Sequence, residues 1–372
     1  MVKFSLLILY TLIMTSSIGA QNNPKNLDID WKTDLSTHSV PLSEFTALLP
    51  PDGIPPIDRP EFMNIEQARD VFFEHEPVIV VKANGVAKAY PLSILMYHEI
   101  VNDQVGKKFL SITYCPLCNA AIVFNRENEF EGKKVLLDFG VSGMLRNSDL
   151  VMYDRQTESW WQQFTGEALA GELTGQILDF YPSMLMSFKN FAEIYSDGQV
   201  LSTETGKGKD YGKNPYVDYD HPENEQPRLF KGSVDDRLPA MERIINITAN
   251  GEHKIYPLST IKDEQVINDQ FHDQSVVIFY DDEMVSVLDD AFIRESKKTG
   301  SVTVFDPVME GNRLSFTRED DVFVDTQTES VWNLAGECVL GKLRGEKLTP
   351  LVHGNHFAFA WFAFQPDCTI YE

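Results

Sequence analysis

Two stretches of this chain repeat each other, and the repetition constrains the fold more than any other feature of the sequence. Residues 84–103 (NGVAKAYPLSILMYHEIVND) and 250–269 (NGEHKIYPLSTIKDEQVIND) are identical at nine of twenty positions. A second pair of blocks, 154–161 and 325–332, is identical at six of eight positions. Because the blocks occur in the same order, the sequence predicts one folding unit that is present twice.

Each predicted unit begins with a β-hairpin. Asn-Gly at 84–85 and at 250–251 lies between alternating apolar residues, and this pair suits the positive φ angles of a type I′ turn. Pro91 and Pro257 predict the first residues of short helices, and residues 61–73 have helical spacing. Short β-rich runs make up much of the rest. The predicted fold is therefore α+β and β-rich, a tandem duplication of one hairpin-initiated unit with a degenerate second copy.

The division of the chain follows from the repeat. The predicted segments are a signal peptide (1–20), an N-terminal extension (21–60), a first repeat unit (61–202), an ordered Tyr/Pro-rich connection (203–240) and a second, degenerate unit (241–372). The connection is long for an inert linker, and such segments are usually functional or mobile. Its tyrosines and prolines favour an ordered lid.

The N-terminus predicts export. Lys3 precedes an apolar run, Phe4–Met14, and small residues follow it, which is the layout of a secretory signal peptide. The run is shorter than the roughly 20 residues of a transmembrane helix, and no later segment approaches that length. We therefore expect an extracytoplasmic protein, periplasmic or secreted, without a transmembrane segment. The net charge of −24 would repel a phosphate backbone, which argues against nucleic acid as a partner.

The most informative short motif is TYCPLCNAAIVF, residues 113–124, with Cys115 and Cys118 two residues apart. A shift of 166 aligns this pair with Asp281–Met284 in the second unit, so the fold does not require it. No long helix follows Cys118, which argues against a thioredoxin-type couple. Cys-Pro-x-Cys followed by Asn119, a residue that tolerates positive φ, instead suits a metal-binding knuckle.

The cysteine pair leaves three interpretations open: a metal or redox site, a structural disulfide, or buried free thiols. Thiolates suit zinc, iron or copper, and a closed site needs further ligands. His98 is the candidate upstream, and Cys338 or Cys368 are candidates in the second unit. An exported protein also permits a Cys338–Cys368 disulfide.

A segment that only the first unit contains is the expected second wall of a pocket. Gly140 and Gly143 around Ser142 predict a flexible turn, with Arg146 and Asp149 beside it. The other candidate ligand contacts are Trp160, Tyr211 and Tyr216.

Further residues have a structural interpretation. Asp154, Asp325, Trp161 and Trp332 occur at matching positions in both units, so we expect them to fix a turn and pack the shared core. His353 and His356 have a spacing usable for a metal, but such pairs are usually ordinary polar residues.

Several motifs in order resemble a family of bacterial extracytoplasmic proteins, domain of unknown function 3179. The resemblance rests on TYCPLCNAAIVF, the segment from LDFGVSGMLRNSD to GELTG, DYGKNPYVDYD and LPAMERI, between about Val78 and Tyr256. One departure is Asn119, where the family pattern has Gly. The resemblance implies export and a recurring set of motifs, and it brings no activity.

Two hypotheses follow. In the first, the exported protein holds a thiolate-containing site in which Cys115 and Cys118 bind a metal ion or cycle between dithiol and disulfide, with His98 as a further ligand. In the second, the protein is a non-catalytic binding module for a small-molecule, carbohydrate or cell-envelope ligand, and Cys115–Cys118 is a structural disulfide. Whether the protein is an enzyme is left open by the sequence.

Overall fold

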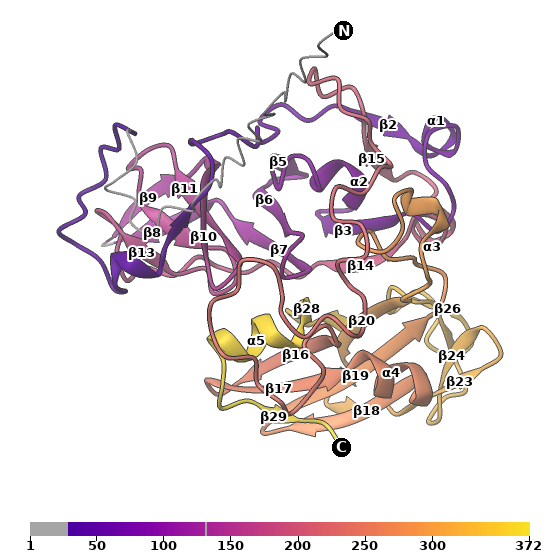
Figure 1. Ribbon diagram of the computed structural model, residues 1–372. Helices are drawn as coiled ribbons and strands as arrows, with labels where there is room; N and C mark the ends of the chain where they lie inside the picture. The colour runs from indigo at the N-terminus through magenta and orange to yellow at the C-terminus, as the bar shows by residue number, and fades with distance from the viewer. Residues whose placement is uncertain (1–28, 131) are drawn as a thin grey trace, which may run out of the picture.

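The computed structural model describes residues 29–130 and 132–372, so the predicted signal peptide lies outside the described residues. The chain is rich in β-strands and has only a few short helices. The N-terminal half, indigo to magenta in Figure 1, packs against the C-terminal half, orange to yellow. The described part of the chain contains no helix that is both long and apolar enough to cross a membrane.

Both predicted hairpins are present. Strands β3 (Pro77–Ala83) and β4 (Val86–Pro91) pair antiparallel, and so do β16 (Arg243–Ala249) and β17 (Glu252–Pro257). The Asn and Gly of each turn have positive φ, between 50° and 83°, as a type I′ turn requires. Helices α2 (Leu92–Leu95) and α4 (Leu258–Glu264) follow directly. The proline before each helix is the N-cap and the last residue of its strand, one position earlier than predicted.

One mixed sheet joins the two halves. Its strand order is β18-β19-β20-β14-β3-β4-β15-β2, and β27 also pairs with β20. The halves meet where Leu185 of β14 pairs with Val302 of β20. The bounds not yet given are β2 (Phe62–Asn64), β14 (Met184–Ser187), β15 (Gln199–Leu201), β18 (Val266–Phe271), β19 (Gln274–Asp281), β20 (Ser301–Asp306) and β27 (Thr349–Pro350). The largest hydrophobic cluster also contains residues of both halves.

Smaller sheets complete the fold. One sheet consists of β5 (Ile100–Val105), β6 (Lys108–Cys115) and β7 (Ala120–Asn125); β8 (Glu127–Phe130) and β9 (Lys133–Leu136) form a ribbon. A second sheet has the order β1 (Thr46–Ala47), β10 (Phe139–Arg146), β11 (Asp149–Asp154), β12 (Trp160–Gln162) and β13 (Ala168–Ala170). A four-stranded sheet in the C-terminal half has the order β23 (Phe316–Glu319), β24 (Val322–Asp325), β25 (Val331–Trp332) and β26 (Cys338–Leu340). A short strand pair, β21 (Val308–Met309) and β22 (Asn312–Arg313), lies beside them.

The C-terminal sheet has the order β28 (Asn355–Phe357), β16, β17 and β29 (Thr369–Ile370). Helix α5 (Ala358–Phe364) follows β28, and α3 (Phe188–Ile194) follows β14 in the N-terminal half. Two single-turn 3₁₀ helices, Leu42–Glu44 and Ile293–Glu295, complete the described elements.

Two local predictions were wrong. Residues 61–73 do not form one helix, because Phe62–Asn64 pairs with β15 as β2, and α1 (Ile65–Arg69) begins only after it, where Asn64 and Gln67 form a capping box. The Gly-Ser-Gly segment is not a flexible turn but part of β10, which is paired with β11 and bulged between Val141 and Met144.

Residues 203–240 run beside the C-terminal half without forming a helix or strand. Asn214, Asp218 and Tyr219 donate backbone hydrogen bonds to the carbonyls of Ala291, Asp289 and Leu288. Tyr219 and Asp220 are buried. The segment thereby lies against the C-terminal half, and the hydroxyl of Tyr219 also bonds the carbonyl of Leu117 in the turn that carries the cysteine pair.

Candidate metal centre

The cysteine pair lies in a tight turn between two antiparallel strands. Cys115 is the last residue of β6, and it pairs with Ala120, the first residue of β7. The backbone N–H of Asn119 donates to the carbonyl of Pro116 at 3.2 Å, and Asn119 has a φ of 51°. The prediction that Asn119 supplies positive φ in such a turn is confirmed. The turn brings both sulfurs to one side, as in metal-binding knuckles.

A carboxylate from a different sheet completes a group of three side chains that could hold a metal ion. The ligand atoms of Cys115, Cys118 and Asp149 all lie within 4.8 Å of one another. Asp149 begins β11, directly after the turn formed by Asn147 and Ser148, both of which have positive φ. The Cys115 thiol also lies 3.7 Å from the carbonyl oxygen of Ser148. The segment expected to form the second wall therefore contacts the cysteines through its hairpin turn.

The hydrogen bonds of Asp149 leave one oxygen free. Its Oδ2 accepts from the side-chain amide of Gln162 at 2.6 Å and from the backbone N–H of Phe164 at 2.9 Å. Its Oδ1 is fully buried and has no hydrogen-bond partner among the described residues. A buried polar atom without a partner costs free energy, and such atoms are rare in folded proteins. This oxygen is therefore available to a ligand at the site.

Burial disfavours the ionised forms of Cys115, Cys118 and Asp149. It raises the pKa of the Cys115 thiol, and it raises the pKa of the Cys118 thiol well above its usual value. Burial also raises the pKa of Asp149 to about 7, although hydrogen bonds from Gln162 and Phe164 oppose the effect. Three buried anionic ligands are stable together only when a cation compensates them.

Glu99 is a fourth acidic group at the site, and the sequence analysis missed it. Burial, followed by the charge of Asp149, raises the pKa of Glu99 to about 8. A comparison of the two similar sequence blocks could have identified Glu99. A shift of 166 places Glu99 on Gln265, and both residues have positive φ, 57° and 66°. The positive φ is thus shared, while the carboxylate at this position is present only in the half that carries the cysteines.

His98 is bonded elsewhere. Its Nδ1 lies 2.6 Å from the carbonyl of Pro55, and its Nε2 lies 2.6 Å from the hydroxyl of Tyr211. Both ring nitrogens are engaged by these bonds, and His98 is not part of the three-residue group. The imidazole instead joins residues 203–240 to the N-terminal half, one position before Glu99.

The other predicted site residues are distributed over several environments. Ser142 is buried and donates to the carbonyl of Val151. Arg146 pairs with Glu44 and reaches Gln162, which in turn bonds Asp149. Trp160 is buried in a separate cluster with Trp31 and Phe45. Burial and then the charges of Glu99 and Cys115 raise the pKa of Tyr216, so this ring lies near the acidic group.

The residues kept in both units have the structural role that was predicted. Asp154 accepts from the backbone N–H of Thr157 and from the indole of Trp161 at 2.9 Å. Asp325 makes the same bonds with Thr328 and Trp332, at 3.0 Å to the indole. All four cysteines are free thiols, and neither Cys338 nor Cys368 belongs to the three-residue group.

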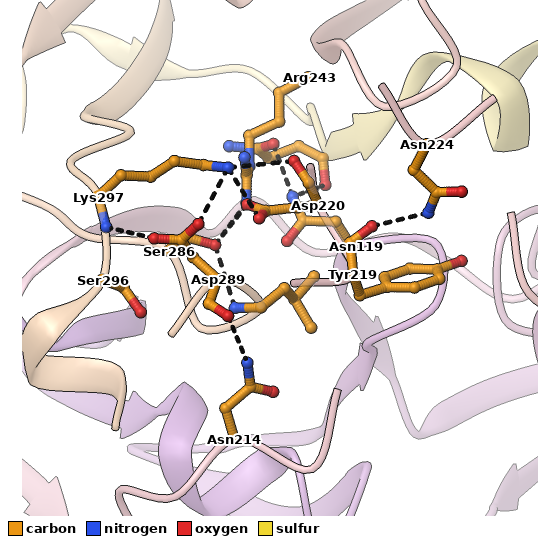
Figure 2. Close-up of polar contacts among 12 residues, drawn as sticks. Asn119, Asn214, Tyr219, Asp220, Asn224, Arg243, Ser286, Asp289, Ser296 and Lys297 are labelled. Atoms are coloured by element: carbon orange, nitrogen blue, oxygen red, sulfur yellow. Dashed lines mark hydrogen bonds and ion pairs between the residues drawn. The ribbon is translucent and has the colours of Figure 1, made fainter. Parts of the chain in front are cut away.

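The Tyr-rich segment covers the cysteine turn. The hydroxyl of Tyr219 donates to the carbonyl of Leu117 at 3.0 Å, and Ser148 donates to the carbonyl of Arg228 at 3.0 Å. Figure 2 shows the polar cluster that anchors this segment, with Asp220 among Arg243, Ser286 and Lys297. The segment is therefore fixed to the C-terminal half and bonded to the turn of the N-terminal half.

The C-terminal half also contacts the turn directly. The Asn119 amide donates to the side-chain oxygen of Asn355 at 3.0 Å, and the backbone N–H of Phe357 donates to the carbonyl of Cys118 at 3.0 Å. Asn355 and Phe357 lie on the same face of β28, and His356 lies on the other. Both halves of the chain therefore hold the Cys115–Cys118 turn.

Comparison with known protein families matches residues 51–368 to a family described as a protein of unknown function (DUF3179). No curated protein and no solved structure gives a significant match.

Proposed function

Because the chain belongs to the DUF3179 family, whose description assigns no activity, we propose its function from the site itself: the protein binds a transition-metal ion through Cys115, Cys118 and Asp149. The observation that carries this proposal is the buried, unpartnered oxygen of Asp149 beside two buried thiols. A metal ion would satisfy that oxygen and compensate the ionised ligands.

The donor set favours zinc over the other candidates. Two thiolates and one carboxylate match the sulfur and oxygen ligands that zinc accepts, whereas copper(I) prefers an all-sulfur set. Three protein ligands also leave one coordination position open, which is typical of catalytic rather than structural zinc sites. A zinc ion held here would supply Lewis-acid chemistry. Glu99 would supply a carboxylate beside the ion, as a further ligand or as a proton acceptor.

A redox couple is the weaker alternative. A reactive cysteine needs a lowered pKa, commonly at a helix N-terminus or beside a cation. Here burial raises the pKa of both thiols, and the charges of Asp149 and Glu99 raise the pKa of Cys115 further. The same surroundings that disfavour a free thiolate favour a bound cation.

We also propose that the two halves arose by duplication and that the protein is exported. The halves share two antiparallel hairpins of equal register, and each hairpin is followed by a short helix. They also share an internal bonding pattern, in which Lys88 and Tyr90 bond Asp103 while Lys254 and Tyr256 bond Asp269. Export rests on the N-terminal sequence and on the family resemblance alone.

The test is elemental analysis of the purified full chain together with a free-thiol count. We expect about one equivalent of metal per chain, chiefly zinc, lost in Cys118→Ser. Cys338→Ser is the matched control, because Cys338 is also a buried free thiol but lies outside the group. A wild-type protein that holds no metal and takes up none under reducing conditions would overturn the proposal. A Cys115–Cys118 disulfide in that protein would favour the binding-module hypothesis.

A further inference from the structure

A cavity of about 430 Å³ lies between the two halves, separate from the cysteine group. Its walls come from β7, from residues 164–183, from the β16–β17 hairpin and from residues 351–365. The volume lies in the range of small-molecule sites, which occur preferentially where two structural units meet. None of the residues proposed to bind the metal lines this cavity.

The cavity has no formal charge. Half of its lining residues are aliphatic or aromatic, with Phe164, Phe180 and Trp361 among the rings, and the others are uncharged polar side chains, histidines and a glycine. Among the described residues that line it, none is Asp, Glu, Lys or Arg. Charged residues make up 24% of this chain, and its net charge is −24. An uncharged lining in such a protein would exclude charged ligands, because an ion would lose its hydration without gaining a partner.

Burial also disfavours the charged form of the three histidines that line the cavity. Burial lowers the pKa of His253 and of His353, and it lowers the pKa of His356 to about 3. His253 and His353 already use Nδ1, bonded to the hydroxyl of Thr248 and to the carbonyl of Leu351. His356 differs from them, because its buried Nδ1 has no hydrogen-bond partner among the described residues.

His356 is held in a defined position. Its side chain is only 2% exposed and packs against Phe164, with 4.4 Å between ring centroids, and against Trp361 in a stacked arrangement. Gly354 provides the space for the imidazole, since a Cβ atom there would lie 2.0 Å from Nε2. A fixed, buried ring with an unused nitrogen is the kind of polar group that orients a ligand in an apolar pocket.

The entrance is apolar too. Ile177 and Val352 line the cavity, yet they are 62% and 42% exposed. Exposed apolar side chains that gather at the rim of a cavity mark a site of binding more often than scattered ones do.

From these observations we propose that the cavity binds an uncharged aromatic molecule that carries one hydrogen-bonding group, which pairs with His356. The rings of Phe164, Phe180 and Trp361 would contact the ligand, and its polar group would hydrogen-bond the imidazole of His356, which lines the cavity. The proposal is independent of the metal centre. It gives the binding hypothesis a defined location and a ligand chemistry.

The test uses two fluorescent probes with the same ring system. N-phenyl-1-naphthylamine is uncharged and has one N–H donor, whereas 1-anilinonaphthalene-8-sulfonate adds a sulfonate. In titrations of the full chain, we expect saturable binding of the neutral probe and at least ~10-fold weaker binding of the sulfonate. Equal affinity for both probes, or no saturable binding of the neutral one, would overturn the proposal.

Two substitutions locate the binding. Ile177→Asp places a charge at the rim and should weaken the neutral probe about fivefold or more. Leu340→Asp is the matched control, since Leu340 is also 62% exposed but lies outside the cavity, and it should leave the affinity unchanged. His356→Phe keeps an aromatic ring and should weaken the probe about fivefold by removing the acceptor. Equal effects of the two Asp variants would contradict the location.

The same titration separates this site from the metal centre. Cys118→Ser should bind the neutral probe like the wild type, because no thiol lines the cavity. Loss of probe binding in Cys118→Ser, with the fold retained by circular dichroism, would contradict the independence of the two sites.

Discussion

Asp149 and Cys115 come from different sheets, yet their ligand atoms lie within 4.8 Å of each other. The contact depends on the β10–β11 turn, which places the carbonyl of Ser148 against the same thiol. One oxygen of Asp149 accepts hydrogen bonds from Gln162 and Phe164, and the other has no hydrogen-bond partner in the part of the chain that the structure describes. Oδ2 of Asp149 therefore has a structural role, and Oδ1 is the atom that could bind a metal ion.

Asp149→Asn tests that separation. The amide oxygen can still accept from Gln162 and Phe164, while the amide nitrogen replaces the free oxygen and cannot ligate a metal. We expect the metal content to fall to background and the melting temperature of the metal-free protein to change little. Elemental analysis and thermal unfolding in a chelator measure the two effects. Full retention of the metal would show that Asp149 is not a ligand.

Glu99→Gln should weaken metal binding without removing it. A carboxylate beside a metal site typically contributes about 10- to 100-fold in affinity. Glu76→Gln is the matched control, because Glu76 is also a buried carboxyl whose pKa burial raises, to about 7, but it lies outside the group. Competition with a chromogenic chelator gives both affinities. Equal affinities in the two variants would remove Glu99 from the site.

Tyr219→Phe should speed metal release. The variant loses the hydrogen bond to the carbonyl of Leu117, so the free energy of unfolding should fall by about 1 kcal/mol. The segment that covers the cysteines should also open more often, and chelators should remove the metal several-fold faster. Tyr181→Phe is the control, since its hydroxyl bonds the carbonyl of Lys82 at 2.9 Å, away from the cysteines. Stopped-flow chelation should find an unchanged rate in that variant.

The Asp220 cluster predicts a pH dependence of stability. Burial alone would raise the pKa of Asp220, but the charge of Arg243 and hydrogen bonds from Ser286 and Lys297 outweigh it and lower the pKa to about 2. A lowered folded-state pKa gives stability that is present above pH ~4 and is lost as the pH falls toward 2. The contribution is roughly 2 kcal/mol.

Urea unfolding between pH 2 and 6 measures that contribution. Asp220→Asn should be less stable than the wild type at pH 6, and the difference should shrink toward pH 2. Asp321→Asn should follow the wild type throughout, because the side chain of Asp321 is 99% exposed. A pH-independent difference between Asp220→Asn and the wild type would contradict the assignment.

Gly143→Ala should be strongly destabilising. Gly143 has a φ of 77°, and a Cβ atom there would lie 2.1 Å from the carbonyl oxygen of Leu49. Gly85→Ala is the matched control, because Gly85 has a similar φ of 83° and no atom lies within 4 Å of where the new Cβ would be. The backbone penalty of about 1 kcal/mol is common to both variants. Gly143→Ala should cost at least ~2 kcal/mol more in chemical denaturation, and equal costs would disprove the close approach of Leu49.

The elements that depend on neighbouring residues in the chain could be predicted from the sequence. The Asn-Gly hairpins, the strands around them and the turn after Cys118 depend on residues next to each other in the chain. The Gly-Ser-Gly segment was misread because the positive φ of Gly143 serves a bulge and a contact with Leu49, about 90 residues earlier. When only neighbouring residues are considered, the two glycines give the sequence pattern of a turn.

The candidate site was only half predictable, for the same physical reason. Cys115 and Cys118 are close in sequence, and their spacing predicts a metal or redox site as one of three interpretations, beside a structural disulfide and buried free thiols. Asp149 was expected to line a pocket but not to bind with the thiols, since that depends on the packing of one sheet on another. Glu99 lacks a motif, and only its comparison with Gln265 singles it out.

The contacts of β28 with the cysteine turn can form only late in the synthesis of the chain. Asn119 and its partner Asn355 lie 236 residues apart, and the bond from Phe357 to Cys118 spans a similar length. A chain that is synthesised from its N-terminus presents the two cysteines without the contacts of β28 until residues 355–357 have been made. The cysteines are thus open to metal, oxidant or another thiol during that interval, and closed afterwards.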